Sequence, residues 1–469
     1  MRRKSLLALA GASAVLACSA AAASATPLHE LTSKTFTQPP TTAQCETSAG
    51  IACYSPNQLE QAYNMNPLYK VGLNGRGKTI VIVDSFGSPT ITQDLATFDK
   101  SFGLPAPPSF KIIQPAGPVP PFDPTNGTMA NWGIETSLDV EYSHAMAPGA
   151  NILLVETPVA ETEGVTGLPE MMDSENFVIN HHLGDVITQS FGATEETFPS
   201  ARSILGLRSA FENAAAHGVT VLASSGDAGP TDATSAPDAM DFYPFPVNSW
   251  PSADPLVTSV GGLQLHLDAN GNRTAPDQAW NDTATLEDNQ SPAAGGGGVS
   301  SVFSRPFYQG SVARVVGNRR GTPDVSLNAA IDGGALVFFS YDASSLGFPP
   351  PPSGGGGLFA IVGGTSEASP LFSGIVAVAD QAAHRDLGLI NPTLYQRGSG
   401  SFSGLSDVST GNTTVTFVNP AGDPFPGQHT VPGFSSVRGY DLATGLGTPD
   451  GPKLVAELAL SRSGFSKRR

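Results

Sequence analysis

Ser366 is the residue whose surroundings point most directly to chemistry. The sequence Gly-Gly-Thr-Ser at positions 363–366 is followed by Pro370 and a run of small apolar residues. This pattern predicts a serine held at the start of a buried helix, where its hydroxyl can act as a nucleophile. Such a hydroxyl attacks only when a neighbouring group takes its proton. None of the 8 histidines in the chain has the glycine and threonine neighbours expected of a histidine base.

Two carboxylates offer a different base. Glu135 and Asp139 are four residues apart in a segment, 131–146, that predicts a helix, so their Cβ atoms should lie about 5–6 Å apart on one face. Two carboxylates this close repel when both are ionised, so one of them keeps its proton to higher pH. An isolated pair of this kind is often only part of a solvated helix face, but the apolar neighbours Ile134 and Leu138 argue against solvation here. Glu135 can therefore accept a proton while Asp139 orients it.

Asp227 is the third candidate and lies at the end of a predicted strand, in the sequence Ser-Gly-Asp-Ala-Gly. The simplest interpretation is a turn in which the aspartate caps backbone amides. Beside a nucleophile, however, a protonated Asp227 can donate a hydrogen bond to a developing oxyanion. An ionised Asp227 would repel that charge.

The elements that would position these residues alternate along the chain. Short apolar runs rich in β-branched residues predict buried strands at 78–87, 150–157, 185–192 and 219–227. Predicted helices lie between or near them, at 131–146, 170–183 and 203–217. This alternation predicts an α/β fold with a parallel sheet, whose functional residues gather at the carboxyl ends of the strands. Two glycine- and proline-rich segments, 293–298 and 348–357, are interpreted as surface insertions in one domain.

The four residues, in this order and these contexts, resemble the sedolisins, or serine-carboxyl peptidases. Further matching stretches lie at 189–196, 250–262, 296–309, 322–329 and 390–395, so the resemblance covers roughly residues 45–460. It implies a single large domain over 55–460, with a subtilisin-like parallel sheet flanked by helices on both faces. It also implies that Glu135 is the base, Asp139 its orienting partner, Asp227 the oxyanion support and Ser366 the nucleophile.

The resemblance further implies one structural calcium ion near the C-terminus. The implied ligands are two carboxylates and three backbone carbonyls, from Asp407, Val408, Val437, Gly439 and Asp441. Oxygen ligands of this kind suit a hard cation. Without the resemblance, the second of these segments would be interpreted as a glycine-rich turn.

The N-terminal region predicts export. Residues 1–25 combine a basic start, an apolar run and a small-residue cleavage site, which is typical of a secretory signal peptide. Cys18 offers an alternative lipoprotein cleavage site. Residues 26–54 are interpreted as an N-terminal arm, in which Cys45 and Cys53 are expected to form a local disulfide. The last residues, 461–469, form a polar tail.

Composition limits the partners of the chain. Its formal net charge of -17 argues against nucleic acid, which requires a basic surface. No stretch after the signal peptide is long and apolar enough to predict a membrane span. We therefore expect a secreted monomer that acts on protein or peptide substrates.

Three features depart from the family pattern. The family usually carries a large N-terminal prosegment, and only about 20 to 30 residues separate the expected cleavage site from Ser55. Glu367 places an acidic residue directly after Ser366, where a small residue is usual. The insertion at 348–357 precedes the nucleophile and could reshape substrate access.

The leading hypothesis is an acid-active endopeptidase that forms an acyl-enzyme on Ser366. One alternative is an Asp-His-Ser subtilisin that uses Asp84 with His144 or His217. The other is a non-catalytic secreted binding or surface protein built on the same scaffold, which the missing prosegment and Glu367 favour.

Overall fold

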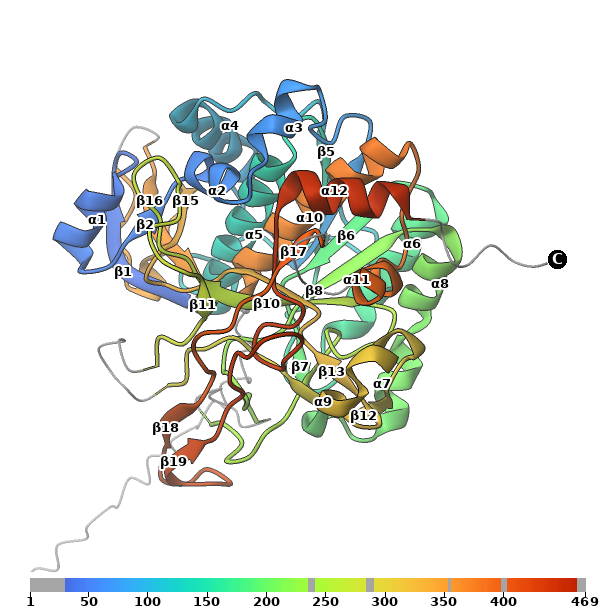
Figure 1. Cartoon of the computed structure of the whole chain (residues 1–469). Coiled ribbons are helices and arrows are strands. Elements are labelled where there is room, and N and C mark those ends of the chain that lie inside the picture. The colour runs from blue at the N-terminus through green and yellow to red at the C-terminus, as the bar shows by residue number, and fades with distance from the viewer. Residues whose placement is uncertain (1–29, 235–240, 284–290, 353–355, 398–402, 462–469) are drawn as a thin grey trace, which may run out of the picture.

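A mostly parallel sheet of eight strands forms the centre of the computed structural model, which describes residues 30–234, 241–283, 291–352, 356–397 and 403–461. The strand order is β11-β10-β8-β6-β3-β5-β4, and β14 also pairs with β10 (Figure 1). Only β11 runs antiparallel to its neighbour. The strands are β3 (Thr79–Ser85), β4 (Phe110–Ile113), β5 (Asn151–Thr157), β6 (Val186–Gln189), β8 (Thr220–Ser224), β10 (Thr258–Gln264), β11 (Gln278–Ala279) and β14 (Val325–Asn328). The four strands predicted from the sequence correspond to β3, β5, β6 and β8.

Helices cover both faces of this sheet. On β3, the side chains of Ile80 and Ile82 pack into one apolar cluster, whereas those of Val81 and Val83 pack into another. The first cluster includes α5 (Gly127–Met146) and α10 (Thr365–Ala383), and the second includes α6 (Leu168–Asn180) and α8 (Ser209–His217). Alternate residues of a strand point to opposite faces, so β3 is buried on both sides, as its apolar run predicted. The predicted α/β class is confirmed.

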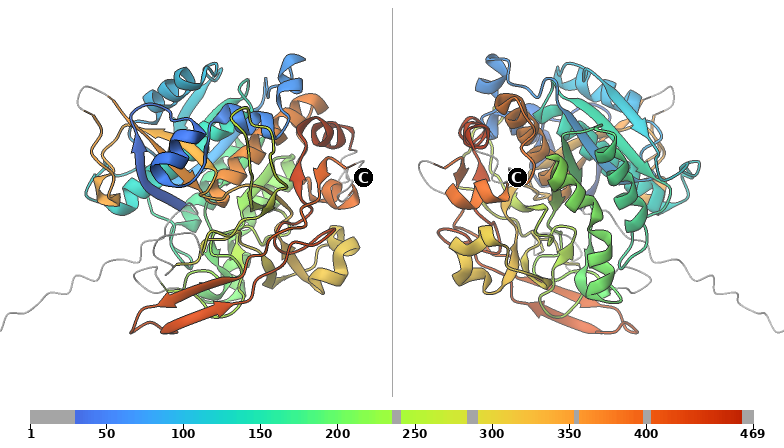
Figure 2. Two further views of the ribbon diagram at one scale, coloured as in Figure 1. Left: turned by 60° about the vertical axis from the view of Figure 1, so that its left-hand side comes forward. Right: turned by 90° about the vertical axis from the view of Figure 1, so that its right-hand side faces the viewer.

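The remaining helices lie around this core (Figure 2). They are α1 (Thr42–Ala49), α2 (Pro56–Ala62), α3 (Asn66–Lys70), α4 (Ile91–Phe102), α7 (Ala201–Leu207), α9 (Ala313–Val316), α11 (Asn391–Arg397) and α12 (Gly451–Leu460). Helix α2 begins as the sequence predicts, with Ser55 at its N-cap, Pro56 in its first turn and a capping box to Gln58. Within the described residues, no helix combines the length and the apolar character that crossing a bilayer requires.

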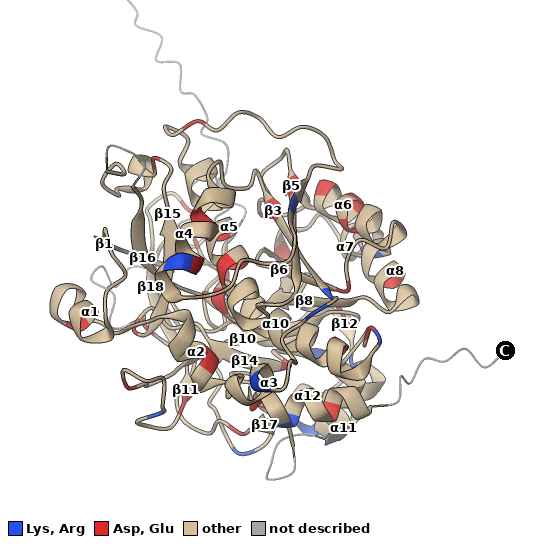
Figure 3. Cartoon of the chain, turned by 90° about the horizontal axis from the view of Figure 1, so that it is seen from above, with Lys and Arg blue, Asp and Glu red and all other residues tan. Residues whose placement is uncertain are grey.

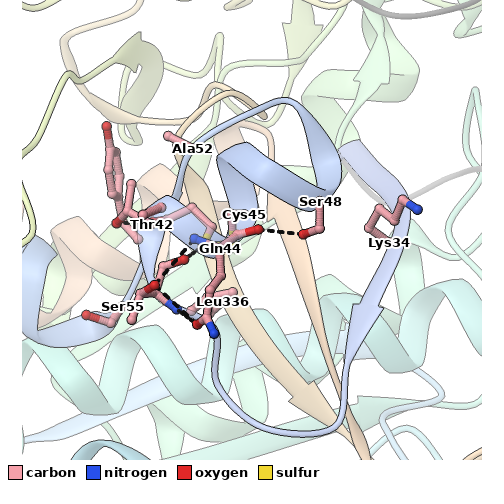
Figure 4. The surroundings of a disulfide bond; sticks show 12 residues. Lys34, Thr42, Gln44, Cys45, Ser48, Ala52, Ser55 and Leu336 are labelled. Atoms are coloured by element: carbon pink, nitrogen blue, oxygen red, sulfur yellow. Dashed lines mark hydrogen bonds between the residues drawn. A yellow bond between two sulfur atoms is a disulfide. The ribbon is translucent and has the colours of Figure 1, made fainter.

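A second, smaller sheet joins the N-terminal arm to the strand that leads into Ser366. Its order is β1-β16-β15-β2, with β1 (Glu30–Phe36), β2 (Cys53–Tyr54), β15 (Gly334–Phe339) and β16 (Leu358–Gly363). The arm is more ordered than its composition suggested, because it also contains α1. Cys45 in α1 and Cys53 in β2 form a disulfide with an S–S distance of 2.04 Å, beside Leu336 of β15 (Figure 4). The predicted signal peptide and residues 462–469 lie outside the described residues.

The interpretation of residues 293–298 as a surface insertion is wrong. These six residues are buried and run alongside the loop that follows β8. The Gly296 N–H donates to the Gly226 carbonyl at 2.7 Å, and the Ser225 hydroxyl donates to the Gly296 carbonyl at 2.8 Å. A Cβ built on Gly296 would lie 2.4 Å from the Ser225 carbonyl oxygen, so glycine is required by close backbone approach and not by flexibility.

The segment 348–357 connects β15 to β16, and Pro349, Pro350 and Pro352 are exposed in it. It precedes β16, whereas Ser366 follows that strand. Six residues of strand span about 20 Å, so the described residues directly before β16 lie at the end of that strand remote from Ser366.

Acidic residues outnumber basic residues by 41 to 24 in the whole chain. Figure 3 shows Asp and Glu in red on many elements, including α5 in the interior. Glu135, Asp139 and Glu141 of α5 are all fully buried. Carboxylates in such positions need a shared proton or several hydrogen-bond donors.

Candidate active site

The candidate nucleophile, Ser366, lies at the start of a buried helix, the position that the sequence predicts. Ser366 is the second residue of α10 and is fully buried. Pro370, four residues later, has no N–H to donate to the Ser366 carbonyl, so this carbonyl lacks its usual intrahelical donor. The Ser366 hydroxyl has no hydrogen-bond partner among the described residues.

Asp227 is held directly beside Ser366 by Thr365. The Thr365 N–H and the Thr365 hydroxyl both donate to Asp227 Oδ1, at 2.7 and 2.6 Å. In turn, the Gly226 N–H donates to the Thr365 hydroxyl at 3.1 Å, and the Ser224 hydroxyl donates to the Thr365 carbonyl at 2.9 Å. The loop after β8 is thereby hydrogen-bonded to the first turn of α10, and Thr365, which contacts Asp227, directly precedes Ser366.

The carboxyl pair on α5 is also assembled. Asp139 accepts a hydrogen bond from the Ser190 hydroxyl at 2.8 Å and is hydrogen-bonded to the Glu135 carboxyl. A hydrogen bond between two carboxyl groups requires that one of them holds a proton. Burial, followed by the charges of Glu135 and Asp84, raises the pKa of Asp139 well above its usual range. Asp139 therefore tends to keep a proton to higher pH than a solvated aspartate does.

Strand β6 brings this pair to the start of α10. Thr188 hydrogen-bonds with Ser369 of α10 through their hydroxyls at 2.8 Å, and Ser190 contacts Asp139. Positions 188 and 190 point to the same face and lie about 6.6 Å apart along an extended chain. Ser369 is one helical turn after Ser366, so Ser366 and the carboxyl pair share one region of the fold.

Helices α5 and α10 also pack against each other further along. The hydroxyls of Ser143 and Ser373 are 3.1 Å apart, and a Cβ on Gly374 would lie 2.4 Å from that of Met146. This contact continues the alignment of the two helices beyond the candidate site. Gly374 is therefore fixed by the need for close helix packing.

Asp84 is a third carboxyl near this pair. The sequence suggests a role for it only as the acid of the alternative Asp-His-Ser site. It lies near the carboxyl end of β3 and is fully buried. Burial raises the pKa of Asp84 well above its usual range, and the neighbouring Glu135 carboxyl raises it further. The sequence could have indicated this position, because Asp84 follows the apolar run of a predicted buried strand and functional residues gather at the carboxyl ends of parallel strands.

The two histidines of that alternative have other partners. The buried His144 ring lies 3.3 Å from Asp99 of α4 and 2.8 Å from the Pro105 carbonyl. His217 Nδ1 lies 3.0 Å from the Asn213 carbonyl. Because the Ser366 hydroxyl has no hydrogen-bond partner among the described residues, neither histidine reaches it. The geometry favours carboxyl groups as the proton acceptor.

The side chain of Glu367 lies in the protein core, against Asn328. Its side chain is fully buried and accepts a hydrogen bond from Asn328 Nδ2 at 2.8 Å. Burial raises the pKa of Glu367 to about 8. The acidic group that departs from the family pattern is therefore a neutral core residue at acid and neutral pH.

The residues expected to hold calcium lie together near the C-terminus. The Gly439 N–H donates to both oxygens of Asp407, at 3.2 and 3.0 Å. The Val437 N–H donates to Asp441 Oδ2 at 2.8 Å. Two carboxylates therefore face one five-residue loop. Within the described residues no group of three or more Asp, Glu, His or Cys side chains could hold a metal ion, so a cation here would also need backbone carbonyls such as that of Val408.

Taken together, these residues define an α/β protein in which a serine at the start of a buried helix shares one region of the fold with several buried carboxyl groups. Kumamolisin from Bacillus sp. (strain MN-32) is 30% identical over 424 residues, which is 89% of this chain and 65% of the relative. Sedolisin from Pseudomonas sp. (strain 101) is 29% identical over 381 residues, covering 81% and 57%. Tripeptidyl-peptidase 1 from Mus musculus is 30% identical over 343 residues, covering 70% and 52%.

Among solved structures, Pseudomonas sedolisin, a serine-carboxyl proteinase complexed with two molecules of pseudo-iodotyrostatin, matches with a TM-score of 0.67 and 26% identity. The match covers 87% of this chain and 98% of that one. No protein-family model matches the chain. The chain belongs to the sedolisin family and has its subtilisin-like fold. It spans between about half and two thirds of the length of these curated relatives.

Proposed function

We propose that this chain is a secreted, acid-active serine-carboxyl endopeptidase that cleaves protein or peptide substrates through an acyl-enzyme on Ser366. One observation carries the proposal: Asp227 is hydrogen-bonded to Thr365 directly before Ser366, and the segment around β6 contacts both Asp139, through Ser190, and Ser369 of α10, through Thr188. A serine with carboxyl groups on two sides has a proton acceptor and an oxyanion donor without any histidine.

In the first step, Glu135 accepts the proton of the Ser366 hydroxyl while the oxygen attacks the substrate carbonyl carbon. Asp139, whose own proton bonds it to Glu135, fixes the orientation of that acceptor. The carbonyl oxygen becomes an oxyanion, which protonated Asp227 stabilises. Since Thr365 donates twice to Asp227 Oδ1, Oδ2 is the atom that would carry this proton.

In the second step, the tetrahedral intermediate collapses and the bond to the leaving amine breaks. Glu135 returns the proton it took, so the amine leaves neutral. Water then attacks the acyl-enzyme, with Glu135 again accepting a proton, and the acid product and the Ser366 hydroxyl are released. Every step needs the protons on Asp139 and Asp227, so activity falls as pH rises.

Calcium binding by the C-terminal loop is part of the same proposal. Asp407 and Asp441 would supply carboxylates, and Val408, Val437 and Gly439 would supply carbonyls. A bound hard cation would neutralise two adjacent carboxylates and stabilise the loop. Its role would be structural, since the hydrogen bonds of Asp407, Val437, Gly439 and Asp441 among the described residues stay within the C-terminal region.

A pH profile with three variants tests the proposal. Peptide hydrolysis measured from about pH 2 to about pH 8 should be maximal at acid pH. Ser366→Ala should reduce kcat by about 10⁴-fold or more, whereas Ser48→Ala, at an exposed serine of α1, should leave kcat unchanged.

Asp227→Asn separates the oxyanion role from a general loss of structure. An asparagine donates a hydrogen bond at every pH, so this variant should keep partial activity and extend it to higher pH. Full activity of the unaltered chain at pH 8 with none at pH 4 would falsify the mechanism. Ser366 that stays unmodified by a fluorophosphonate or peptide aldehyde probe would instead support a non-catalytic binding protein.

A further inference from the structure

Three carboxyl groups outside the candidate catalytic set gather at the same edge of the sheet. Glu161 follows β5, and its N–H donates to the Ser85 hydroxyl at 3.0 Å, one residue after Asp84. Glu163 Oε2 accepts hydrogen bonds from the Thr194 N–H and the Thr197 hydroxyl, at 2.9 and 3.0 Å. Asp232 lies five residues after Asp227 and accepts from the Ala233 N–H at 2.9 Å and from the Ser249 hydroxyl.

Thr194 links two of these carboxyl groups, because its N–H donates to Glu163 and its hydroxyl donates to the Ala233 carbonyl, next to Asp232. Burial and the charge of Asp232 raise the pKa of Glu161, and burial and the charges of Asp232 and Glu161 raise the pKa of Glu163. Glu161 is 1% exposed and Asp232 is 9% exposed, whereas Glu163 is half-buried. Glu163 is therefore the most exposed of the three.

No basic side chain among the described residues forms an ion pair with these three carboxyl groups. None of the ion pairs among the described residues includes Glu161, Glu163 or Asp232. In addition, Glu161 Oε1 is buried without a hydrogen-bond partner. A buried, unpartnered acceptor costs about 1–3 kcal/mol of stability, and a donor that reaches it recovers this energy.

An aromatic wall borders the same carboxyls. The Tyr243 N–H donates to the Asp232 carbonyl at 3.1 Å, and burial together with four nearby acids, Glu163 first among them, raises the pKa of Tyr243 to about 12. The rings of Phe245 and Phe425 lie 5.3 and 5.9 Å from that of Tyr243, and Phe245 is 42% exposed. Aromatic faces next to carboxylates bind both the alkyl stem and the charged end of a basic side chain.

We propose that Glu161, Glu163 and Asp232 recognise a lysine or arginine side chain of the peptide substrate, close to the bond that is cleaved. This inference rests on the proposed function for its substrate class. The position follows from the chain: the Thr194 hydroxyl donates to the Ala233 carbonyl at 2.8 Å, joining the loop after β6 to the loop that carries Asp227. A side chain seated there belongs to a residue within a few positions of the scissile bond.

Binding to an inactive variant tests the inference without requiring turnover. Ser366→Ala is titrated by calorimetry with blocked peptides that carry one lysine, scanned along the sequence, and with the same peptides carrying norleucine. At one position, lysine should bind at least tenfold more tightly than norleucine. The preference should grow as pH rises, because the Glu161, Glu163 and Asp232 carboxyls lose protons; the other titratable side chains that face them are Glu196, Asp241 and Tyr243.

Adding Glu161→Gln and Glu163→Gln to that variant should reduce the preference to about twofold or less, while norleucine peptides keep their affinity. Glu163→Gln alone, at the half-buried position, should reduce it in part and guards against misfolding of the double change. Glu46→Gln, at an exposed glutamate of α1, is the matched control and should retain the preference.

Three results would overturn the inference: no position that prefers lysine, a preference that survives both substitutions, or stabilisation by calcium that disappears with them. The last result would identify a metal ion as the occupant. Cleavage of norleucine peptides by the unaltered chain is measured in parallel, so that loss of the proposed activity and loss of the proposed specificity are seen separately.

Discussion

Gly296→Ala tests whether the buried glycine segment positions Asp227. The new Cβ would lie 2.4 Å from the Ser225 carbonyl oxygen and 2.8 Å from the Gly226 carbonyl oxygen. A comfortable carbon–oxygen contact is about 3.3 Å, so one of the two backbones must move by roughly 0.9 Å. Both neighbours precede Asp227 directly, and the Ala294 N–H also donates to the Asp227 carbonyl at 2.7 Å. The displacement therefore reaches the carboxyl group that we assign to the oxyanion.

Overpacking of this kind lowers the free energy of unfolding by about 1–3 kcal/mol. A catalytic group misplaced by about 1 Å loses about 100-fold in rate, so kcat/KM should fall by about 10- to 100-fold. Peptide hydrolysis at acid pH measures the rate, and thermal unfolding measures the stability. Titration of active sites with a fluorophosphonate counts the folded enzyme, so that the rate refers to active molecules.

Gly206→Ala in α7 is the matched control. Its Cβ would have no heavy atom within 4 Å, and alanine in a helix is more stable than glycine by about 0.5–1 kcal/mol. This variant should gain stability and keep its activity. If Gly296→Ala cleaves peptides within twofold of the unaltered chain, the role of the segment in positioning Asp227 is refuted.

Three further outcomes follow from buried charge, the disulfide and the calcium loop. Burial raises the pKa of Glu367 to about 8, so the folded chain keeps a proton that the unfolded chain loses above about pH 4.5. Between these two pH values the free energy of unfolding should fall by about 1.4 kcal/mol per pH unit. Urea titrations measure this slope, and Glu367→Gln should remove the part that Glu367 contributes. Exchanging both Cys45 and Cys53 for alanine opens a loop of eight residues and should lower the free energy of unfolding by about 2.5 kcal/mol, while reductant then has no further effect. A chelator should lower Tm, and Asp441→Asn should lower it equally and abolish the chelator effect; an unchanged Tm in chelator contradicts the calcium proposal.

The layered part of the fold could be predicted because its signals are local. The runs around Ile80 and Val83 are apolar on both strand faces, and only a sheet covered on both sides satisfies such a pattern. Glu135 and Asp139 could be paired for the same reason, since helical spacing alone places them on one face. The cap of Ser55 and the disulfide partner of Cys53 also depend on near neighbours in the chain.

The remaining features depend on contacts between distant segments. A run of glycines such as 293–298 has the composition of a loop, and only the approach of the Ser225 backbone makes it a buried segment. Glu367 follows the nucleophile in sequence, yet the helix turns its side chain toward Asn328 in the core. Asp84 joins the carboxyl pair only because β3 lies beneath α5. Composition carries no information on any of these distances.

Strand β16 leads directly into the helix that carries Ser366, and β1 pairs with one edge of β16. Leu31 pairs with Val362 and Phe36 with Phe359, so the first described strand of the chain covers one whole edge of the strand that leads into the nucleophile. Removal of the chain through residue 36 would leave that edge open to solvent and to other chains. Any cleavage that preserves this pairing must therefore fall before Glu30.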